Sequence, residues 1–266
     1  IALVLQPLLF ATLTKDLARF DASAGFFIKA PFPHLTSKTS ASNPAASFLE
    51  SIEAVIKSGL ESSIQDWPGR IGHFNKGFPP SGPMDSWSFR LANLLVGNSS
   101  GDAGIECQFI GPELRFLEDC VIAITGADMQ PKIDGTPCAM WESILIKTGQ
   151  TLEMSYAASG ARSYLALAGG ISVDAALGSR ATFDAAGIGG VDGHALKEGQ
   201  KIKSGTHRGL VSGQRVLTES RPEISANCSW EIEVVAGPND DWIDQEGHER
   251  FLNSEWKVSA KSNRMG

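Results

Sequence analysis

The sequence has few cysteines, and none of them has the spacing that structural zinc sites or disulfide frameworks require. Cys107, Cys120, Cys138 and Cys228 are scattered without a Cys-x-x-Cys pair, so we expect buried free thiols in a reducing compartment. Basic residues are also few, since Lys and Arg number 23 against 30 Asp and Glu, a formal net charge of -7. No basic cluster interrupts this balance, which disfavours nucleic acid and anionic membranes as partners.

Motifs for nucleotide, serine-hydrolase and metal chemistry are missing or stand in the wrong context. The chain has no phosphate-binding Gly-x-x-x-x-Gly-Lys-Ser/Thr loop, and the glycines of 187–193 have the wrong spacing for a dinucleotide fingerprint. Residues 97–101 match Gly-x-Ser-x-Gly, but we expect a helix before them and a strand after them, the reverse of a nucleophile elbow. The five histidines lie far apart, so no metal site is predicted.

Long hydrophobic runs are also lacking. Residues 1–10 are apolar apart from Gln6, but the run is too short to span a membrane and lacks the basic start of a signal peptide. We therefore expect a cytoplasmic protein. The chain begins without Met and ends without an evident closing element, and we expect it to be a piece of something longer.

The composition along the chain predicts three parts. Residues 1–54 are expected to be a tail or linker, because 36–46 are mostly Ser, Thr, Asn, Pro and Ala and cannot bury much surface. Residues 55–210 are expected to form a first barrel subdomain. Polar residues and glycine return near 209–221, and 211–266 is expected to be the start of a second, truncated barrel subdomain.

Hydrophobic periodicity predicts one helix followed by many short strands. The spacing of Met84, Trp87, Leu91 and Leu95 indicates a helix over 84–96, with Pro83 in its first turn and Gly97 as its stop. Afterwards the period changes to two and turn signals recur. The expected strands are 120–125, 143–146, 151–155, 163–168, 230–235 and the beginning of one at 256–260, with a short helix over 240–252. Evenly spaced short strands favour a closed or nearly closed antiparallel barrel.

Two polar clusters lie on stretches rich in glycine and proline. Residues 65–70, Gln-Asp-Trp-Pro-Gly-Arg, place an amide, a carboxylate and a guanidinium beside rigid backbone. Residues 80–85, Pro-Ser-Gly-Pro-Met-Asp, do the same with a hydroxyl, backbone amides and a carboxylate. Rigid loops at a barrel rim are typical places for binding groups. The alternative is structural, with Asp85 at the positive end of its helix and Arg70 holding a loop carbonyl.

The same two clusters carry a family resemblance. Gln65–Arg70, 77–86, 89–93 and 96–98 resemble the allophanate hydrolase subunit 2 family, and more narrowly the carboxyltransferase region of biotin-dependent urea carboxylase, also found fused in urea amidolyase. Further matches run in order along the chain, at 105–106, 111–112, 167–171, 177–183, 189–190, 237–238 and 262–266. Asp174, His194 and Gln200 depart from the family pattern.

The resemblance implies a mainly β protein with cyclophilin-like β-barrels and a few short helices, and a carboxyltransferase part of a biotin-dependent ligase that is inactive alone. The implied reaction moves a carboxyl group from carboxybiotin to urea to give allophanate. Biotin is then carried by another domain, since this chain lacks the Met-Lys pair of a carrier, and ATP is used only in a biotin carboxylase domain. A second carboxyltransferase part is the remaining partner.

Urea has one carbonyl acceptor and four N–H donors, so its site needs acceptors facing a donor. On these grounds the predicted site comprises the catalytic candidates Asp66, Arg70 and Asp85 and the substrate-binding candidates Gln65, Ser81, Gly82, Asn263 and Arg264. Which of them is the general base stays open. Two alternatives also stay open, a lactam hydrolase resembling the C subunit of 5-oxoprolinase and a non-catalytic protein resembling a kinase-inhibitor partner.

Overall fold

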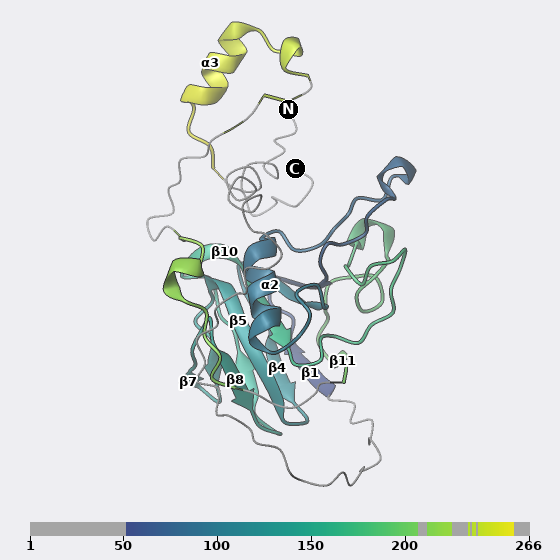
Figure 1. Ribbon diagram of the computed structural model, residues 1–266, viewed down its shortest axis with the longest axis vertical. Helices are drawn as coiled ribbons and strands as arrows, with labels where there is room; N and C mark the ends of the chain where they lie inside the picture. Colours follow the sequence, from purple (N-terminus) through teal and green to yellow (C-terminus); the bar gives the residue numbers. More distant parts are fainter. Residues whose placement is uncertain (1–51, 207–211, 225–233, 235, 238, 258–266) are drawn as a thin grey trace, which may run out of the picture. The chain divides into compact units, whose positions relative to one another are not determined.

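The computed structural model describes residues 52–206, 212–224, 234, 236–237 and 239–257 (Figure 1). The chain forms two compact units, one of residues 28–228 and one of residues 1–27 with 229–266. The expected strand at 230–235 and the expected site residues Asn263 and Arg264 lie largely or wholly outside the described residues. The domain boundaries at 54 and 210 stay predictions.

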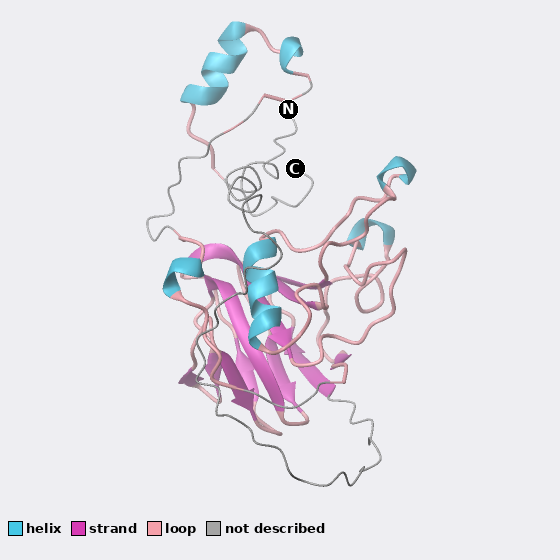
Figure 2. Cartoon of the chain, viewed as in Figure 1, coloured by secondary structure: helices cyan, strands magenta, loops and turns pink. Residues whose placement is uncertain are grey.

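The unit of residues 28–228 is built on two antiparallel sheets (Figure 2). The six-stranded sheet has the order β11 (Lys201–Lys203), β1 (Ile52–Lys57), β4 (Glu113–Phe116), β9 (Thr151–Glu153), β6 (Lys132–Ile133) and β7 (Thr136–Pro137). The five-stranded sheet has the order β2 (Glu61–Gln65), β3 (Gly104–Gln108), β10 (Ser159–Leu167), β5 (Cys120–Asp128) and β8 (Ser143–Ile146). The predicted mainly β fold is confirmed.

Side-chain alternation along the five-stranded sheet separates two hydrophobic clusters. On β5, Ile122 and Ile124 belong to a cluster shared with the other sheet, in which Leu114 and Leu152 are fully buried. Neighbouring residues such as Ala123 point to the opposite face and pack with helix α2 (Ser86–Leu95). The period of two is the reason, because successive strand residues face opposite sides of a sheet.

Helix α2 lies on the second face, against β5 and β10 (Figure 1). The apolar spacing predicts this helix, and the structure shortens it at the beginning. Its N-cap is Asp85, whose side chain accepts hydrogen bonds from the backbone N–H groups of Trp87 and Ser88. Pro83 therefore precedes the cap and does not lie in the first turn. Four 3-10 turns are described as well, at Phe74–Lys76, Asp184–Ala186, Thr218–Ser220 and Asp240–Trp242.

The unit that contains 229–266 is described chiefly through α3 (Gln245–Asn253). Asp244 caps this helix by accepting a hydrogen bond from Gly247 N. The helix expected over 240–252 is thus a 3-10 turn followed, after a break, by a shorter α-helix. Residues 256 and 257, expected to begin a strand, are described without regular structure.

One edge of the five-stranded sheet is β2, and the segment that follows β10 is hydrogen-bonded to it. Thr182 N donates to Ile64 O at 2.8 Å, and Leu196 N donates to Ser62 O at 2.7 Å. These bonds bring a loop more than a hundred residues distant in sequence against the end of β2. They also place that loop beside the first of the two polar clusters found in the sequence.

Candidate functional site

The two glycine- and proline-rich corners predicted as site loops are in direct contact. Arg70 N donates to Pro80 O at 2.6 Å. Gly69 has a φ of +83°, and a Cβ built on it lies 2.4 Å from Pro80 O, so both its backbone conformation and its neighbour require glycine there. Gly82, with a φ of +82°, packs near the Asp66 carbonyl, and Ser81 beside it is half-buried. The sequence clusters therefore form one structural junction.

Asp66 binds protein groups across this junction. The residue is 9% exposed. Its Oδ1 accepts a hydrogen bond from Ser179 Oγ at 2.6 Å, and its Oδ2 accepts one from Arg180 N at 2.7 Å. The carboxylate thus fastens the segment after β10 to the corner after β2. Ser179 and Arg180 lie more than a hundred residues from Asp66 in the sequence, so no local pattern could identify them as its partners.

Arg70 is fully buried and binds the same distant segment. Its Nε donates to Ala176 O at 3.0 Å and its Nη2 donates to Ala181 O at 2.8 Å. Burial lowers the pKa of the guanidinium, an effect that the nearby Asp66 carboxylate opposes. Carbonyl oxygens carry no full charge, so this buried cation is only partly compensated.

Asp85 has a different, local role. Its Oδ1 accepts hydrogen bonds from Trp87 N and Ser88 N, each at 3.0 Å, and Ser88 Oγ donates to its Oδ2. A carboxylate at this position satisfies N–H groups at the helix start and favours the positive end of the helix dipole. The structural alternative considered for Asp85 therefore describes its contacts. Among the described contacts, the Asp85 carboxylate binds groups at the start of α2, whereas the Asp66 carboxylate and the Arg70 guanidinium bind the segment 176–181.

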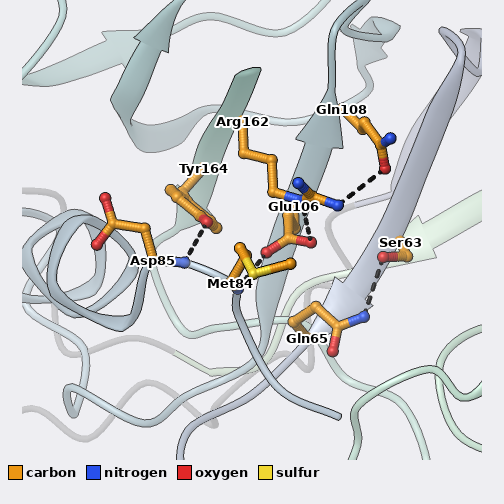
Figure 3. A network of polar contacts seen from close by, with 8 residues as sticks. All are labelled: Ser63, Gln65, Met84, Asp85, Glu106, Gln108, Arg162 and Tyr164. Atoms are coloured by element: carbon orange, nitrogen blue, oxygen red, sulfur yellow. Dashed lines mark hydrogen bonds and ion pairs between the residues drawn. The ribbon is translucent and has the colours of Figure 1, made fainter. Parts of the chain in front are cut away.

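A buried polar network lies on the α2 side of the five-stranded sheet (Figure 3). Glu106 and Gln108 come from β3, and Arg162 and Tyr164 come from β10, where the register pairs Arg162 with Gln108 and Tyr164 with Glu106. Arg162 donates to Glu106 Oε1 at 3.3 Å and to Gln108 Oε1 at 3.1 Å. The side chains of the ion pair are 13% and 4% exposed. Low exposure makes such a pair sensitive to loss of either partner.

This network holds the second corner. Glu106 Oε2 accepts a hydrogen bond from Met84 N at 2.7 Å, and the Tyr164 hydroxyl accepts one from Asp85 N at 2.7 Å (Figure 3). Burial, and secondarily the charges of Glu106 and Asp85, raise the pKa of Tyr164 well above its ordinary value, so the hydroxyl stays neutral. Sequence reasoning missed these residues. Polar side chains two apart on buried strands were the available signal.

Gln65 lies beside the network on the end of β2. Its Nε2 donates to Ser63 Oγ at 3.0 Å, and Ser63 faces Glu106 across the sheet. Gln65 is fully buried, and its Oε1 has no hydrogen-bond partner among the described residues. The structure thus brings the predicted residues Gln65, Asp66 and Arg70 together with Ser81 and Gly82, while Asp85 faces the helix.

A separate open cleft of about 600 Å³ is lined by none of the network residues. It is bounded by Ser159 of β10, by Trp141 and by the stretch 218–224. The Arg221 guanidinium lies 5.9 Å from the centre of a Trp141 ring and donates to Val216 O. The predicted site residues that the structure describes all lie away from the lining of this cleft.

The described ranges contain neither a metal-binding cluster nor a membrane-spanning helix. In those ranges no three His, Cys, Asp or Glu side chains gather closely enough to hold a metal ion. No helix of that part of the chain has the length and apolar content needed to cross a membrane. Cys107, Cys120 and Cys138 form no disulfide within the part of the chain that the structure describes, and burial raises the pKa of the Cys107 thiol to about 12.

Comparison with known proteins gives a consistent family. Residues 76–266 match the family model described as carboxyltransferase domain, subdomain A and B. The chain is 39% identical over 214 residues to urea amidolyase of Saccharomyces cerevisiae, covering 78% of this chain and 12% of that protein. It is 33% identical over 214 residues to the 5-oxoprolinase C subunit of Escherichia coli, covering 80% of this chain and 66% of that protein.

A solved structure extends the comparison to three dimensions. The crystal structure of the Kluyveromyces lactis urea carboxylase matches with a TM-score of 0.73 and 37% identity, over 80% of this chain and 20% of that one. The chain therefore spans between about an eighth and a fifth of the urea-enzyme relatives described here.

Proposed function

Because the chain belongs to the family of the carboxyltransferase domain, subdomain A and B, we propose that it is the part of a urea carboxylase or urea amidolyase in which a carboxyl group passes to urea to give allophanate. The observation that carries the proposal is the likeness to urea amidolyase, 39% identical over 78% of the chain. The likeness to the 5-oxoprolinase C subunit is lower, at 33%.

The junction offers the kinds of groups that this reaction needs. Carboxyl transfer requires a donor that stabilises charge on a carbonyl oxygen, an acceptor for an N–H proton and a place that excludes water. Arg70 is a buried cation whose Nη1 has no partner in the described part of the chain, and Gln65 Oε1 is a buried acceptor. Asp66 lies between them in sequence and is nearly buried. These groups support the proposal that substrate recognition occurs at this junction.

Biotin enters the proposal as a group carried by another domain. When bound, carboxybiotin supplies the carboxyl group and has a ureido carbonyl that requires hydrogen-bond donors. Arg70 Nη1, unpartnered within the described ranges, is a donor of that kind, so the residues of the junction fit such chemistry. The part played by this chain is to orient the acceptor, to hold the Pro80–Asp85 corner through Glu106 and Tyr164, and to exclude water.

The remaining partners follow from the same proposal. We expect an ATP-using biotin carboxylase domain, a biotin carrier and a second carboxyltransferase part outside this chain, and no transfer activity from the chain alone. A cytoplasmic location stays a prediction. Asn263 and Arg264 stay predicted substrate-binding residues, and Asp66, Arg70 and Asp85 stay predicted catalytic residues.

The test uses the intact enzyme that contains this chain. Purified enzyme is supplied with bicarbonate and ATP, and ATP cleavage and allophanate formation are measured with and without urea. We expect urea to stimulate ATP cleavage and allophanate to appear in equal amount. Turnover of 5-oxoproline without dependence on biotin, combined with no response to urea, would contradict the proposal.

A lactam hydrolase is the second candidate, and one observation favours it. The chain covers 66% of the E. coli 5-oxoprolinase C subunit but only 12% of the yeast urea amidolyase. Replacing the matching segment of that bacterial protein with this chain, and assaying 5-oxoproline cleavage beside its natural partners, tests this candidate directly.

A further inference from the structure

The loop of residues 71–79 leaves the junction and returns to it. Arg70 N donates to Pro80 O at 2.6 Å, and this bond closes the loop at its base. Figure 2 shows the 3-10 turn Phe74–Lys76 near the end of this loop, extended away from both sheets. The junction proposed for substrate recognition therefore carries a projection on the outside of the chain.

Hydrogen bonds within the loop give its tip a defined shape. His73 O accepts hydrogen bonds from Lys76 N at 2.9 Å and from Phe78 N at 3.2 Å, and Gly77 N donates to Phe74 O at 3.0 Å. Behind the tip, the ring of Phe78 packs edge-on against Phe183, with ring centres 6.5 Å apart. A loop that is already shaped in this way loses little conformational freedom when it binds a partner.

The loop exposes two large apolar side chains. Ile71 is 61% exposed and Phe74 is 71% exposed. One exposed apolar side chain is common on a protein surface, but two on one short projecting loop are typical of a contact surface. Aromatic side chains are also enriched in protein interfaces. The loop therefore has the features of a docking element for another protein surface.

The charge of the loop indicates the chemistry of its partner. Residues 71–80 contain Lys76 and no Asp or Glu, although the whole chain has a formal net charge of -7. Lys76 is exposed. Interfaces place opposite charges against each other, so the matching surface has an apolar pocket with carboxylates at its rim.

The size and position of the loop distinguish between the partners expected for the proposed function. Stable protein interfaces bury about 1,200 Å² or more, and smaller contacts are typical of transient encounters. A short loop with two exposed apolar side chains makes a contact of the small kind. A biotin carrier has to arrive with its carboxyl group and leave in every turnover, whereas a second carboxyltransferase part stays in place. The small contact beside the junction therefore favours the carrier.

We propose that loop 71–79 docks the biotin carrier domain, with Ile71 and Phe74 in an apolar pocket of the carrier and Lys76 beside carboxylates at the rim of that pocket. This inference rests on the proposed function and adds a partner surface to it. The loop holds the carrier beside the junction while the carboxyl group passes to the acceptor.

Photo-cross-linking in the intact enzyme tests the contact directly. Phe74→p-benzoylphenylalanine places a light-activated group at the tip, and mass spectrometry of the irradiated enzyme identifies the peptides joined to it. The matched control is the same substitution at Leu60, which is 56% exposed and precedes β2 at the end opposite to Gln65. We expect cross-links to the carrier from position 74 and none from position 60. Carrier cross-links from neither position, or equally from both, overturn the docking role.

Steady-state kinetics of Phe74→Ser separates docking of the carrier from binding of urea. Because Phe74 is mostly exposed, we expect its melting temperature to stay within about 2 °C of the wild type. Loss of an aromatic anchor is expected to lower kcat about tenfold and to leave the KM for urea unchanged. Lys76→Glu is expected to lower kcat by a smaller factor, and Leu60→Ser is expected to change neither constant. A raised KM for urea with an unchanged kcat would place urea at the loop and overturn the proposal.

The outcomes also distinguish this inference from the proposed function. A wild-type enzyme that forms allophanate from urea, combined with no carrier cross-link from position 74, overturns the docking role and leaves the proposed function in place. A wild-type enzyme with no urea-dependent turnover overturns both.

Discussion

The two corners that form the junction both contain glycine and proline, but their charged side chains bind partners at different distances along the chain. The Pro80–Asp85 corner ends in a carboxylate that binds groups two and three residues away, at the start of α2. The Gln65–Arg70 corner contains a carboxylate and a guanidinium whose partners lie more than a hundred residues away, at Ala176–Ala181. Both carboxylate oxygens of Asp85 accept hydrogen bonds from groups at the start of α2. Long-range satisfaction leaves Arg70 with one nitrogen unpaired among the residues that the structure describes.

The same kind of substitution is therefore expected to change the stability of the protein by different amounts at the two corners. A residue that binds its own helix affects that helix, whereas a residue that joins distant segments affects the closure of the junction. From the sequence alone, Asp66→Asn, Arg70→Ala and Asp85→Asn are expected to have equal effects on transfer, about a hundredfold each with ATP cleavage unchanged. The contacts now separate stability effects among them.

Arg70→Ala is expected to have the largest effect. It leaves the buried carbonyl of Ala181 without its donor, removes one of the two donors to Ala176 O, which keeps the N–H of Ser179, and empties the space of a fully buried side chain, so the free energy of unfolding falls by about 3 kcal/mol. Urea-dependent transfer per folded molecule falls at least a hundredfold. Denaturant unfolding and activity on one preparation measure both.

The control for Arg70 is Arg180→Ala, because Arg180 is exposed and its side chain donates a hydrogen bond to Val173 O. We expect a loss within about 0.5 kcal/mol there. If Arg70→Ala cost no more than this control and kept full activity, the distinction between the two corners would be lost.

Glu106→Gln comes second and tests how the local corner is held to the sheet. The substitution keeps an acceptor for Met84 N but removes the charge opposite Arg162, whose side chain is 13% exposed. A destabilisation of about 2–3 kcal/mol is expected, below the full cost of a completely buried broken pair because Arg162 retains some solvent. Thermal unfolding of Glu106→Gln beside Glu113→Gln provides the comparison, since Glu113 pairs with an exposed lysine. Equal shifts in the two variants count against the network.

Asp85→Ala is expected to have a smaller effect, about 1 kcal/mol, which is the usual loss for a helix N-cap. If the cap is its whole contribution, Asp85→Ser restores most of the stability and the activity per folded molecule. Circular dichroism melting and transfer assays on both variants decide the point. Activity that stays a hundredfold low in a stable Asp85→Ser enzyme would instead establish a catalytic role for the carboxylate.

Asp119 gives the smallest effect and a surface reference for both corners. Hydrogen bonds from Lys147, Thr148 N and the Thr148 hydroxyl lower the pKa of Asp119 to about 2. The pKa is lower in the folded state than in the unfolded chain, so the ionised Asp119 stabilises the fold. This stabilisation is complete above about pH 4 and disappears as the pH falls toward 2. Carboxyl titration by NMR measures it, and Lys147→Met is expected to move the midpoint upward. An unmoved midpoint excludes Lys147 as the main cause.

The sequence predicted what depends on neighbours along the chain. Helix α2 and the strands β5 and β8 follow from local periodicity and turn residues, and the cap at Asp85 matches the structural alternative considered for that residue. The Arg70 partners were not predictable, because they depend on how the loop after β10 returns to the edge of β2. Glu106 and Arg162 were missed for a related reason. Pairing them requires the register of β3 against β10, which no local pattern specifies.

The bonds from Thr182 and Leu196 to β2 have a consequence for association between molecules. An exposed edge strand presents unpaired backbone groups on which another chain can add a strand. The returning loop takes the Ser62 and Ile64 carbonyls of that edge, and Arg70 is one of the side chains that hold the loop by its Ala181 carbonyl. We therefore expect the loss of this one guanidinium to loosen the loop that covers this edge of the sheet and to leave the edge open to pairing with another chain.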